Sequence, residues 1–121
     1  MLYLLRHGQS IVNIERRIKC RRLDGDLTTL GYNQAHKAGL WLKEKRIRYI
    51  VTSPVMRAQQ TAEIIGKVLN LRPQVDDRLR EMDCGDLEDR TDDGAWDIWH
   101  RIYNNWLNGI PDAQFPNGES Y

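Results

Sequence analysis

The 121-residue sequence lacks the features that mark membrane-spanning or secreted proteins. Its longest apolar runs are a few residues, far short of the roughly 20 needed to cross a bilayer. The N-terminus passes from Met1 through the apolar run at 2–5 to Arg6, without a basic region, a long apolar region or a small-residue cleavage site. We therefore expect no secretory signal and no membrane partner.

Cysteine is also scarce. Cys20 and Cys84 lie far apart in the sequence and form no C-x-x-C motif. This usage predicts free thiols in a reducing compartment, and hence a cytoplasmic protein. Internal repeats and low-complexity segments are absent as well, and the length allows one domain, spanning residues 1–121.

Neither sign of charge dominates, because the net charge is +1, and this balance predicts no nucleic-acid partner. The charges are unevenly distributed, however. A basic run at 16–22 holds five arginines and lysines, and an acidic run at 76–93 holds nine aspartates and glutamates. Each run is most simply a solvated loop, and the acidic run does not follow the calcium-loop pattern.

The sequence alternates strand and helix patterns. Leu2–Arg6 and Tyr49–Thr52 predict strands, and a third short strand is expected within 75–79. A first helix is expected from the Thr28 cap to about residue 45. A second helix is expected from a Ser53 cap, with Pro54 in the first helical position, to Asn70. A third helix, rich in tryptophan, is expected over 95–107. Residues 85–94 and 111–120 predict loops. This order indicates an α/β fold with a parallel sheet flanked by helices.

Polar side chains follow the first two predicted strands. Arg6 and His7 come after the first strand, and Ser53 and Arg57 come after the second. Ligands of parallel sheets bind beyond the carboxyl ends of the strands. Two guanidinium groups and a histidine at one such edge, beside a helix N-terminus, suit a phosphate dianion.

The motifs around these residues resemble those of the histidine phosphatase superfamily, the phosphoglycerate-mutase-like enzymes. Five segments match in family order: Leu5-Arg6-His7-Gly8-Gln9-Ser10 with Asn13; Leu27-Thr28 with Gly31, Gln34, Ala35 and Gly39; Thr52-Ser53-Pro54 with Arg57-Ala58 and Thr61-Ala62; Leu79-Arg80-Glu81 with Gly85 and Glu88; and Pro116-Asn117-Gly118-Glu119-Ser120. The resemblance implies the family's three-layer α/β/α fold.

The resemblance also implies roles for single residues. His7 would take the phosphoryl group as phosphohistidine, and Arg6 and Arg57 would disfavour the imidazolium by like-charge repulsion. Arg6, Arg57 and Asn13 would hold the phosphoryl oxygens. Glu81 would protonate the leaving group and then activate water. No metal and no cofactor are expected, because the guanidinium groups supply the positive charge.

Without the motifs, these assignments would be weak. A single histidine after a strand is more often structural than catalytic, and Glu81 is one of nine acids in its stretch. Of the other histidines, His36 is expected to be exposed on a helix and His100 to pack among the tryptophans. The tryptophan stripe itself predicts core or lid.

The sequence also departs from the family pattern. The family's second catalytic histidine, in a late S-H-G, has no counterpart, so the chain resembles an N-terminal portion of the domain, truncated at the C-terminus. We expect such a chain to be weakly active or inactive alone, and to self-associate or pair with the missing half. Cys20 stands where a glycine is common, and Cys84 replaces an aromatic residue. Leu87 and Asp89 replace the tryptophan and the glycine of a W-E-G motif.

The predicted function is metal-independent hydrolysis of a small phosphorylated metabolite, and the phosphatase branch around α-ribazole phosphatase fits best. A phosphoglycerate mutase, which is an isomerase, is one alternative. The other alternative is an inactive pseudo-phosphatase that only binds phosphorylated ligands.

Overall fold

A computed structural model describes residues 1–22 and 24–120. These residues form two compact units. Unit 1 comprises residues 1–14 and 24–80, and unit 2 comprises residues 15–22 and 81–120. The single-domain organisation of the whole chain stays a prediction.

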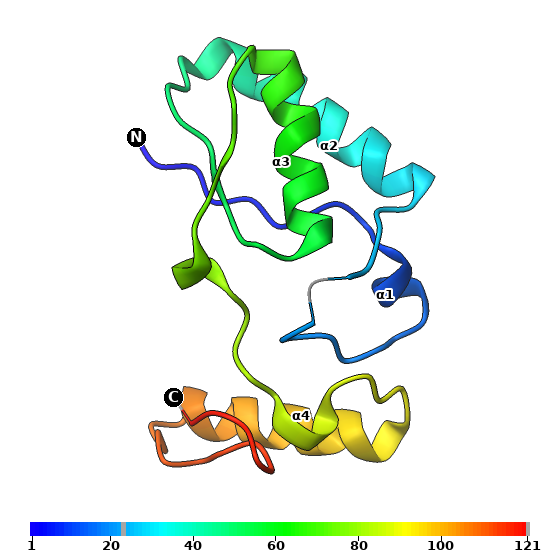
Figure 1. The fold of residues 1–121 in the computed structure, drawn as a ribbon. Helices are drawn as coiled ribbons and strands as arrows, with labels where there is room; N and C mark the ends of the chain where they lie inside the picture. Colours follow the sequence, from blue (N-terminus) through cyan, green and yellow to red (C-terminus); the bar gives the residue numbers. More distant parts are fainter. Residues whose placement is uncertain (23, 121) are drawn as a thin grey trace. The chain divides into compact units, whose positions relative to one another are not determined.

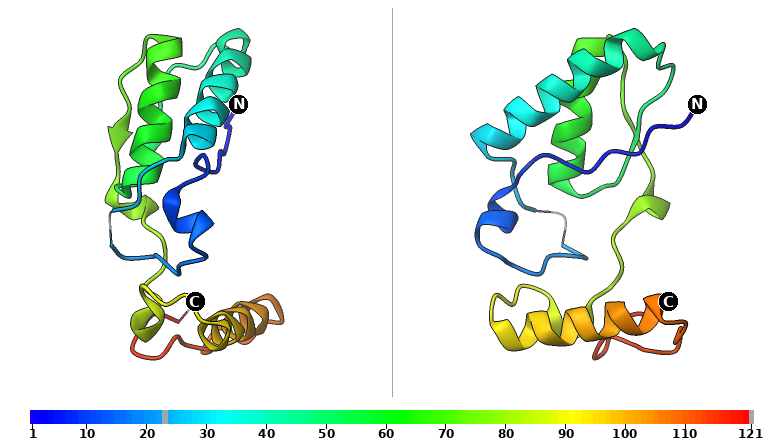
Figure 2. Two further views of the ribbon diagram at one scale, coloured as in Figure 1. Left: turned by 90° about the vertical axis from the view of Figure 1, so that its right-hand side faces the viewer. Right: turned by 180° about the vertical axis from the view of Figure 1, so that it is seen from behind.

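Two packed helices dominate unit 1. Helix α2 (Thr29–Leu42) and helix α3 (Met56–Leu69) lie side by side (Figures 1 and 2). Gly39 permits the close approach, because a Cβ atom there would lie 3.1 Å from the Val68 side chain. Ala35, Leu42 and Ile65 are buried on the two helices. The short helix α1 (Ile11–Ile14) and the 3₁₀ turn η1 (Lys43–Lys45) also belong to this unit.

The helix boundaries follow local capping chemistry. Thr28 caps α2 as predicted, since its hydroxyl oxygen accepts a hydrogen bond from the Gly31 N–H. Asn70 ends α3 in the left-handed conformation, also as predicted. The predicted Ser53 cap is wrong. Val55 has extended backbone and occupies the cap position, so Pro54 lies in the preceding turn and the helix begins only at Met56.

The sheet is parallel, as predicted, but short. Strand β1 (Val51–Thr52) pairs with strand β2 (Gln74–Val75), with Val51 opposite Gln74 and Thr52 opposite Val75. The third predicted strand contributes only Val75, because Asp76 caps a 3₁₀ turn, η2 (Asp77–Leu79), directly after it.

The predicted strand at Leu2–Arg6 is wrong. A strand exists only where its backbone groups pair with a neighbour, and within the described residues this segment joins no ladder. Leu2 and Leu4 are 81% and 88% exposed. The apolar pattern therefore marks a segment suited to burial but without a strand partner in unit 1.

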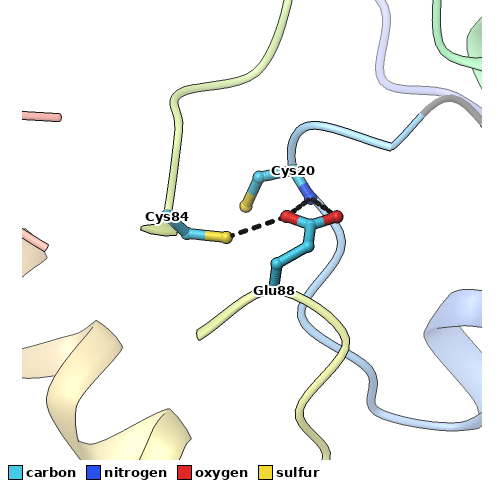
Figure 3. Close-up of side chains that lie close together, drawn as sticks. All are labelled: Cys20, Cys84 and Glu88. Carbon is cyan, nitrogen blue, oxygen red and sulfur yellow. Dashed lines mark hydrogen bonds between the residues drawn. The ribbon is translucent and has the colours of Figure 1, made fainter. Parts of the chain in front are cut away.

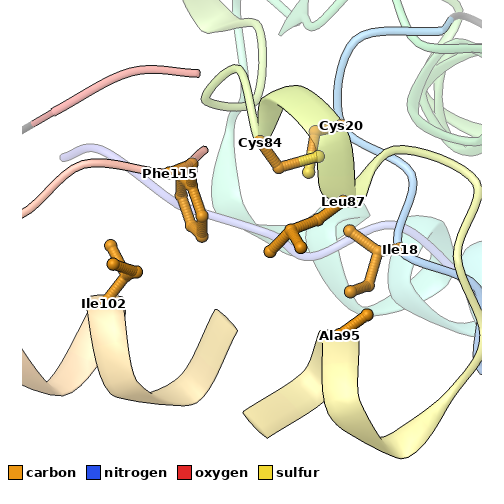
Figure 4. Close-up of a cluster of buried hydrophobic side chains, with 7 residues drawn as sticks. All are labelled: Ile18, Cys20, Cys84, Leu87, Ala95, Ile102 and Phe115. Atoms are coloured by element: carbon orange, nitrogen blue, oxygen red, sulfur yellow. The ribbon is translucent and has the colours of Figure 1, made fainter. Parts of the chain in front are cut away.

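Unit 2 is built on helix α4 (Asp93–Leu107) and the 3₁₀ turn η3 (Gly85–Leu87). Figure 4 shows its buried core, which consists of Ile18, Cys20, Cys84, Leu87, Ala95, Ile102 and Phe115. Three tryptophans of the predicted stripe, Trp96, Trp99 and Trp106, pack partly buried against this core. The Trp106 ring meets the Phe115 ring edge-on at 5.3 Å, and the Trp106 indole N–H donates to the Ala113 carbonyl. In the described part of the chain, no helix combines the length and apolarity needed to cross a membrane.

The basic run pairs with the part of the acidic run that belongs to unit 2. Lys19 Nζ lies 2.6 Å from Asp89 Oδ1, and Arg22 Nη1 lies 2.6 Å from Asp89 Oδ2. Arg21 pairs with Asp83 at 3.0 Å. The runs are therefore partners of one another rather than two independent solvated loops.

Asp92 offers a test of the α4 cap. Hydrogen bonds from Arg90 and, to a smaller extent, from the Ala95 N–H that it caps together lower the pKa of Asp92 to about 2. A lowered carboxyl pKa stabilises the fold at pH values above its unfolded value of about 4, and this stability is lost as the pH falls towards 2. We expect Asp92→Ala to destabilise unit 2 at pH 7, with a difference from wild type that shrinks between pH 4 and pH 2 in thermal unfolding. Asp92→Asn should keep the cap but lose this pH dependence, and a pH-independent deficit in both variants would contradict the assignment.

The exposed apolar side chains of unit 1 predict self-association. Leu2, Leu4, Tyr49, Val51 and Val75 are all exposed, and the two-stranded sheet has open edges. We expect light scattering to give a mass above that of one chain. Leu4→Lys should lower this mass, whereas Leu30→Lys, on the exposed face of α2, should not. A monomeric wild-type chain would contradict the prediction.

Candidate active site

His7 is held in one tautomer by two hydrogen bonds. Its Nδ1–H donates to the Gly8 carbonyl oxygen at 2.7 Å, and its Nε2 accepts a hydrogen bond from the Arg57 Nε–H at 3.1 Å. The imidazole is therefore neutral, with its proton on Nδ1 and its lone pair on Nε2. A histidine in this state can act as a nucleophile through Nε2.

Thr61 fixes the loop that carries His7 onto helix α3. Its hydroxyl accepts a hydrogen bond from the Gly8 N–H at 3.1 Å and donates to the Arg57 carbonyl at 2.7 Å. Arg57 and Thr61 lie one turn apart on α3, and both are buried. One hydroxyl thus links the histidine loop to the turn of α3 that carries the arginine.

Glycine pairs bring the same loop against the start of helix α2. A Cβ atom at Gly8 would lie 2.4 Å from the Gly31 carbonyl oxygen, and one at Gly31 would lie 2.0 Å from the Gln9 carbonyl oxygen. The Gln9 N–H donates to the Gln34 side chain at 2.8 Å. This close approach explains the glycines at both positions.

Arg6 and Asn13 lie in the same unit but differ in their surroundings. Arg6 is exposed and shares with His7 the lining of a pocket of about 220 Å³, beside residues of α2 and α3. The Asn13 side-chain oxygen accepts hydrogen bonds from the backbone and the hydroxyl of Ser10, both at 3.0 Å. The Asn13 amide nitrogen is therefore the group suited to donate to an anion.

Glu81 belongs to unit 2. It is exposed, and its Oε1 accepts a hydrogen bond from the Met82 N–H at 3.3 Å. The segment that follows is held by Glu119. The Glu119 carboxylate accepts a hydrogen bond from the Asp83 N–H, and the Glu119 N–H donates to the Asp83 carbonyl oxygen, each at 2.8 Å. Gly85 adopts φ +53° there, and a Cβ atom at Gly85 would lie 2.1 Å from the Pro116 carbonyl oxygen.

Glu88 anchors the loop at 20–22. Its carboxylate accepts hydrogen bonds from the backbone N–H groups of Cys20, Arg21 and Arg22. Burial raises the pKa of Glu88, but these backbone donors and the Cys84 thiol outweigh burial and leave the pKa below its usual value. Glu88 is therefore ionised at neutral pH and joins the two sequence segments of unit 2.

Thr61, Gln34 and Glu88 lie within the matched motifs, which predict no role for them. The sequence spacing could have predicted one contact of Thr61. A threonine four residues after Arg57 on the same helix face can donate its hydroxyl to the Arg57 carbonyl oxygen. The remaining histidines are where they were expected. His36 is exposed on α2, and the His100 ring lies 5.6 Å from the Trp99 ring and 5.8 Å from the Trp96 ring.

Known proteins share this arrangement of motifs. Residues 2–121 match the sequence model of the histidine phosphatase superfamily (branch 1). A relative from Yersinia pestis, named "Probable phosphoglycerate mutase GpmB", is 37% identical over 98% of this chain and 55% of its own length. The chain thus spans about half the length of the curated relatives it matches.

Two solved structures are also similar. A mycobacterial glucosyl-3-phosphoglycerate phosphatase has 34% identity and a TM-score of 0.71, over 94% of this chain and 53% of the other. The α-ribazole phosphatase from Shigella flexneri has 26% identity and a TM-score of 0.74, over 94% of this chain and 56% of the other. Both support the predicted α/β fold.

The Thr61 hydroxyl can be tested by Thr61→Val, which keeps the side-chain shape. The Gly8 N–H then loses its partner in a buried position, and we expect the free energy of unfolding to fall by about 1–3 kcal/mol in urea titrations. Thr29→Val, at an exposed position of α2, is the matched control and should change stability little. Equal stability of Thr61→Val and wild type would show that the bridge contributes nothing.

Proposed function

Because the chain belongs to the histidine phosphatase superfamily, we propose that its protein hydrolyses a phosphomonoester of a small metabolite through a phosphohistidine at His7. The observation that carries this proposal is the His7 tautomer. The Gly8 carbonyl holds the ring proton on Nδ1 and leaves the Nε2 lone pair for attack. The proposal needs no metal and no cofactor, since Arg6 and Arg57 provide positive charge.

In the first proposed step, His7 Nε2 attacks phosphorus. The P–N bond forms as the ester P–O bond breaks, and Glu81 gives its proton to the departing oxygen. The Arg57 Nε–H, which donates to Nε2 in the structure, turns to a phosphoryl oxygen before the attack and so frees the Nε2 lone pair. Arg6 and the Asn13 amide nitrogen hold the other oxygens.

In the second proposed step, water attacks the phosphohistidine. Glu81 takes the water proton, the P–O bond forms and the P–N bond breaks. Inorganic phosphate and neutral His7 are the products. The similarity to the glucosyl-3-phosphoglycerate and α-ribazole phosphatases supports a small phosphorylated metabolite as substrate.

A phosphoglycerate mutase is the second candidate. It is favoured by relatives of that name at 37% identity. In a mutase, the phosphohistidine would pass its phosphoryl group to a second hydroxyl of the substrate rather than to water. The two candidates share the first step and differ only in the acceptor.

The same proposal includes the compartment. Both cysteines are free thiols, which supports a reducing cytoplasm. Pairing with a second copy, or with the remaining half of the domain known from the longer relatives, would cover the exposed apolar side chains of unit 1.

Phosphorylation of the chain tests the first step. We expect phosphoramidate or 2,3-bisphosphoglycerate to give an acid-labile, base-stable phosphohistidine in wild type. His7→Ala should abolish the label, whereas His36→Ala, at an exposed position of α2, should keep it. A label that persists in His7→Ala, or no label in wild type, would contradict the proposal.

The products distinguish the candidates. Release of inorganic phosphate from phosphomonoesters supports the phosphatase, and interconversion of 2- and 3-phosphoglycerate supports the mutase. Phosphate binding by calorimetry without any labelling would support the ligand-binding alternative instead.

A further inference from the structure

Unit 2 contains a cluster of three potential metal ligands that the proposed phosphatase chemistry does not use. Cys20 Sγ, Cys84 Sγ and a Glu88 carboxylate oxygen all lie within 4.8 Å of one another. Figure 3 shows the two sulfur atoms and the carboxylate facing each other. Cys20 and Cys84 are buried, and Glu88 is half-buried. We propose that Cys20, Cys84 and Glu88 form a structural zinc site.

The donor set selects the kind of metal. Two thiolates and one carboxylate are ligands of Zn²⁺, whereas Ca²⁺ and Mg²⁺ prefer oxygen alone. In a tetrahedral zinc site, with Zn–S bonds of about 2.3 Å, neighbouring ligand atoms lie roughly 3.5–3.8 Å apart. The Cys84 Sγ–Glu88 Oε2 distance is already 3.1 Å. The three ligand atoms lie at most 4.8 Å apart, so a shift of about 1 Å brings them to the tetrahedral spacing. A change in the cysteine side-chain rotamers can supply this shift. Water can supply the fourth ligand on the open side of Glu88.

The charges also balance. The Glu88 carboxylate accepts a hydrogen bond from the Cys84 thiol, which keeps its proton. Binding of Zn²⁺ to two thiols releases two protons, so the cluster carries a charge of −1 before and after. The cation takes the place of the thiol proton on the carboxylate oxygen, so metal binding adds no net charge to the cluster.

A disulfide between the same cysteines is less well supported. Its formation needs a thiolate and an oxidant that reaches it. Cys20 and Cys84 are both buried beside the Glu88 carboxylate, so an oxidant in solution has little access to their sulfur atoms. A cation, in contrast, is attracted by the same carboxylate.

The site would stabilise unit 2. Cys20 belongs to the segment 15–22, and Cys84 and Glu88 belong to the segment that begins at residue 81. A metal held by both segments adds a cross-link to the backbone hydrogen bonds that Glu88 already accepts from the loop at 20–22. Binding to the folded state alone raises its stability by mass action.

Cobalt titration tests the proposal in the reduced 121-residue chain. We expect one Co²⁺ per chain, intense sulfur-to-cobalt charge-transfer absorption, displacement by Zn²⁺, and two protons released per ion. Cys20→Ser and Cys84→Ser should each weaken binding by at least about 100-fold. His100→Gln, which removes an exposed histidine of the same unit, should bind as wild type does. A cobalt spectrum without sulfur absorption, or unchanged binding in either cysteine variant, would overturn the proposal.

A measurement on wild type alone guards against variants that fail to fold. Zinc X-ray absorption should show two sulfur neighbours at about 2.3 Å together with oxygen neighbours. Zinc should also raise the melting temperature of the chain. A first shell of nitrogen and oxygen only, or a Cys20–Cys84 disulfide in the reduced preparation, would overturn the proposal.

Discussion

The Thr61 hydroxyl is the contact on which the candidate active site depends. It accepts from the Gly8 N–H and donates to the Arg57 carbonyl, so it joins the loop after residue 6 to helix α3. This link places the His7 ring where Arg57 meets its Nε2. The glycines that face each other at the start of α2 let the loop come close enough for this bond. Much of the site geometry thus follows from the buried Thr61 hydroxyl and from the small size of Gly8 and Gly31.

Unit 2 relies on a carboxylate in a comparable way. The Glu88 carboxylate accepts hydrogen bonds from three backbone N–H groups of the loop at 20–22. Asp89 forms ion pairs with Lys19 and Arg22 of the basic run. The exposed arginine pairs add little, since water screens them. The backbone bonds matter more, because they satisfy N–H groups of a loop that enters the core through Cys20.

The sequence supported the prediction of features whose cause is local. The Thr28 cap and the Asn70 end of α3 depend on neighbouring residues only, and both are confirmed. The Leu2–Arg6 strand depends on a distant partner, which hydrophobicity cannot supply, and it is wrong. Likewise, Cys20 and Cys84 gave no motif because the turn η3 and the loop at 20–22 bring them together only in space. The contact of His7 with Arg57 was expected from strand order, but its tautomer required coordinates.

The two arginines near His7 are not equivalent. Arg57 is 5% exposed, whereas Arg6 is exposed. The attraction between a guanidinium and a phosphate grows as water is excluded, because the effective dielectric constant falls. In the proposed mechanism, Arg57 therefore interacts more strongly than Arg6 with the charge at the reacting phosphorus. Arg6, in open solvent, is suited to attract and orient an incoming phosphate.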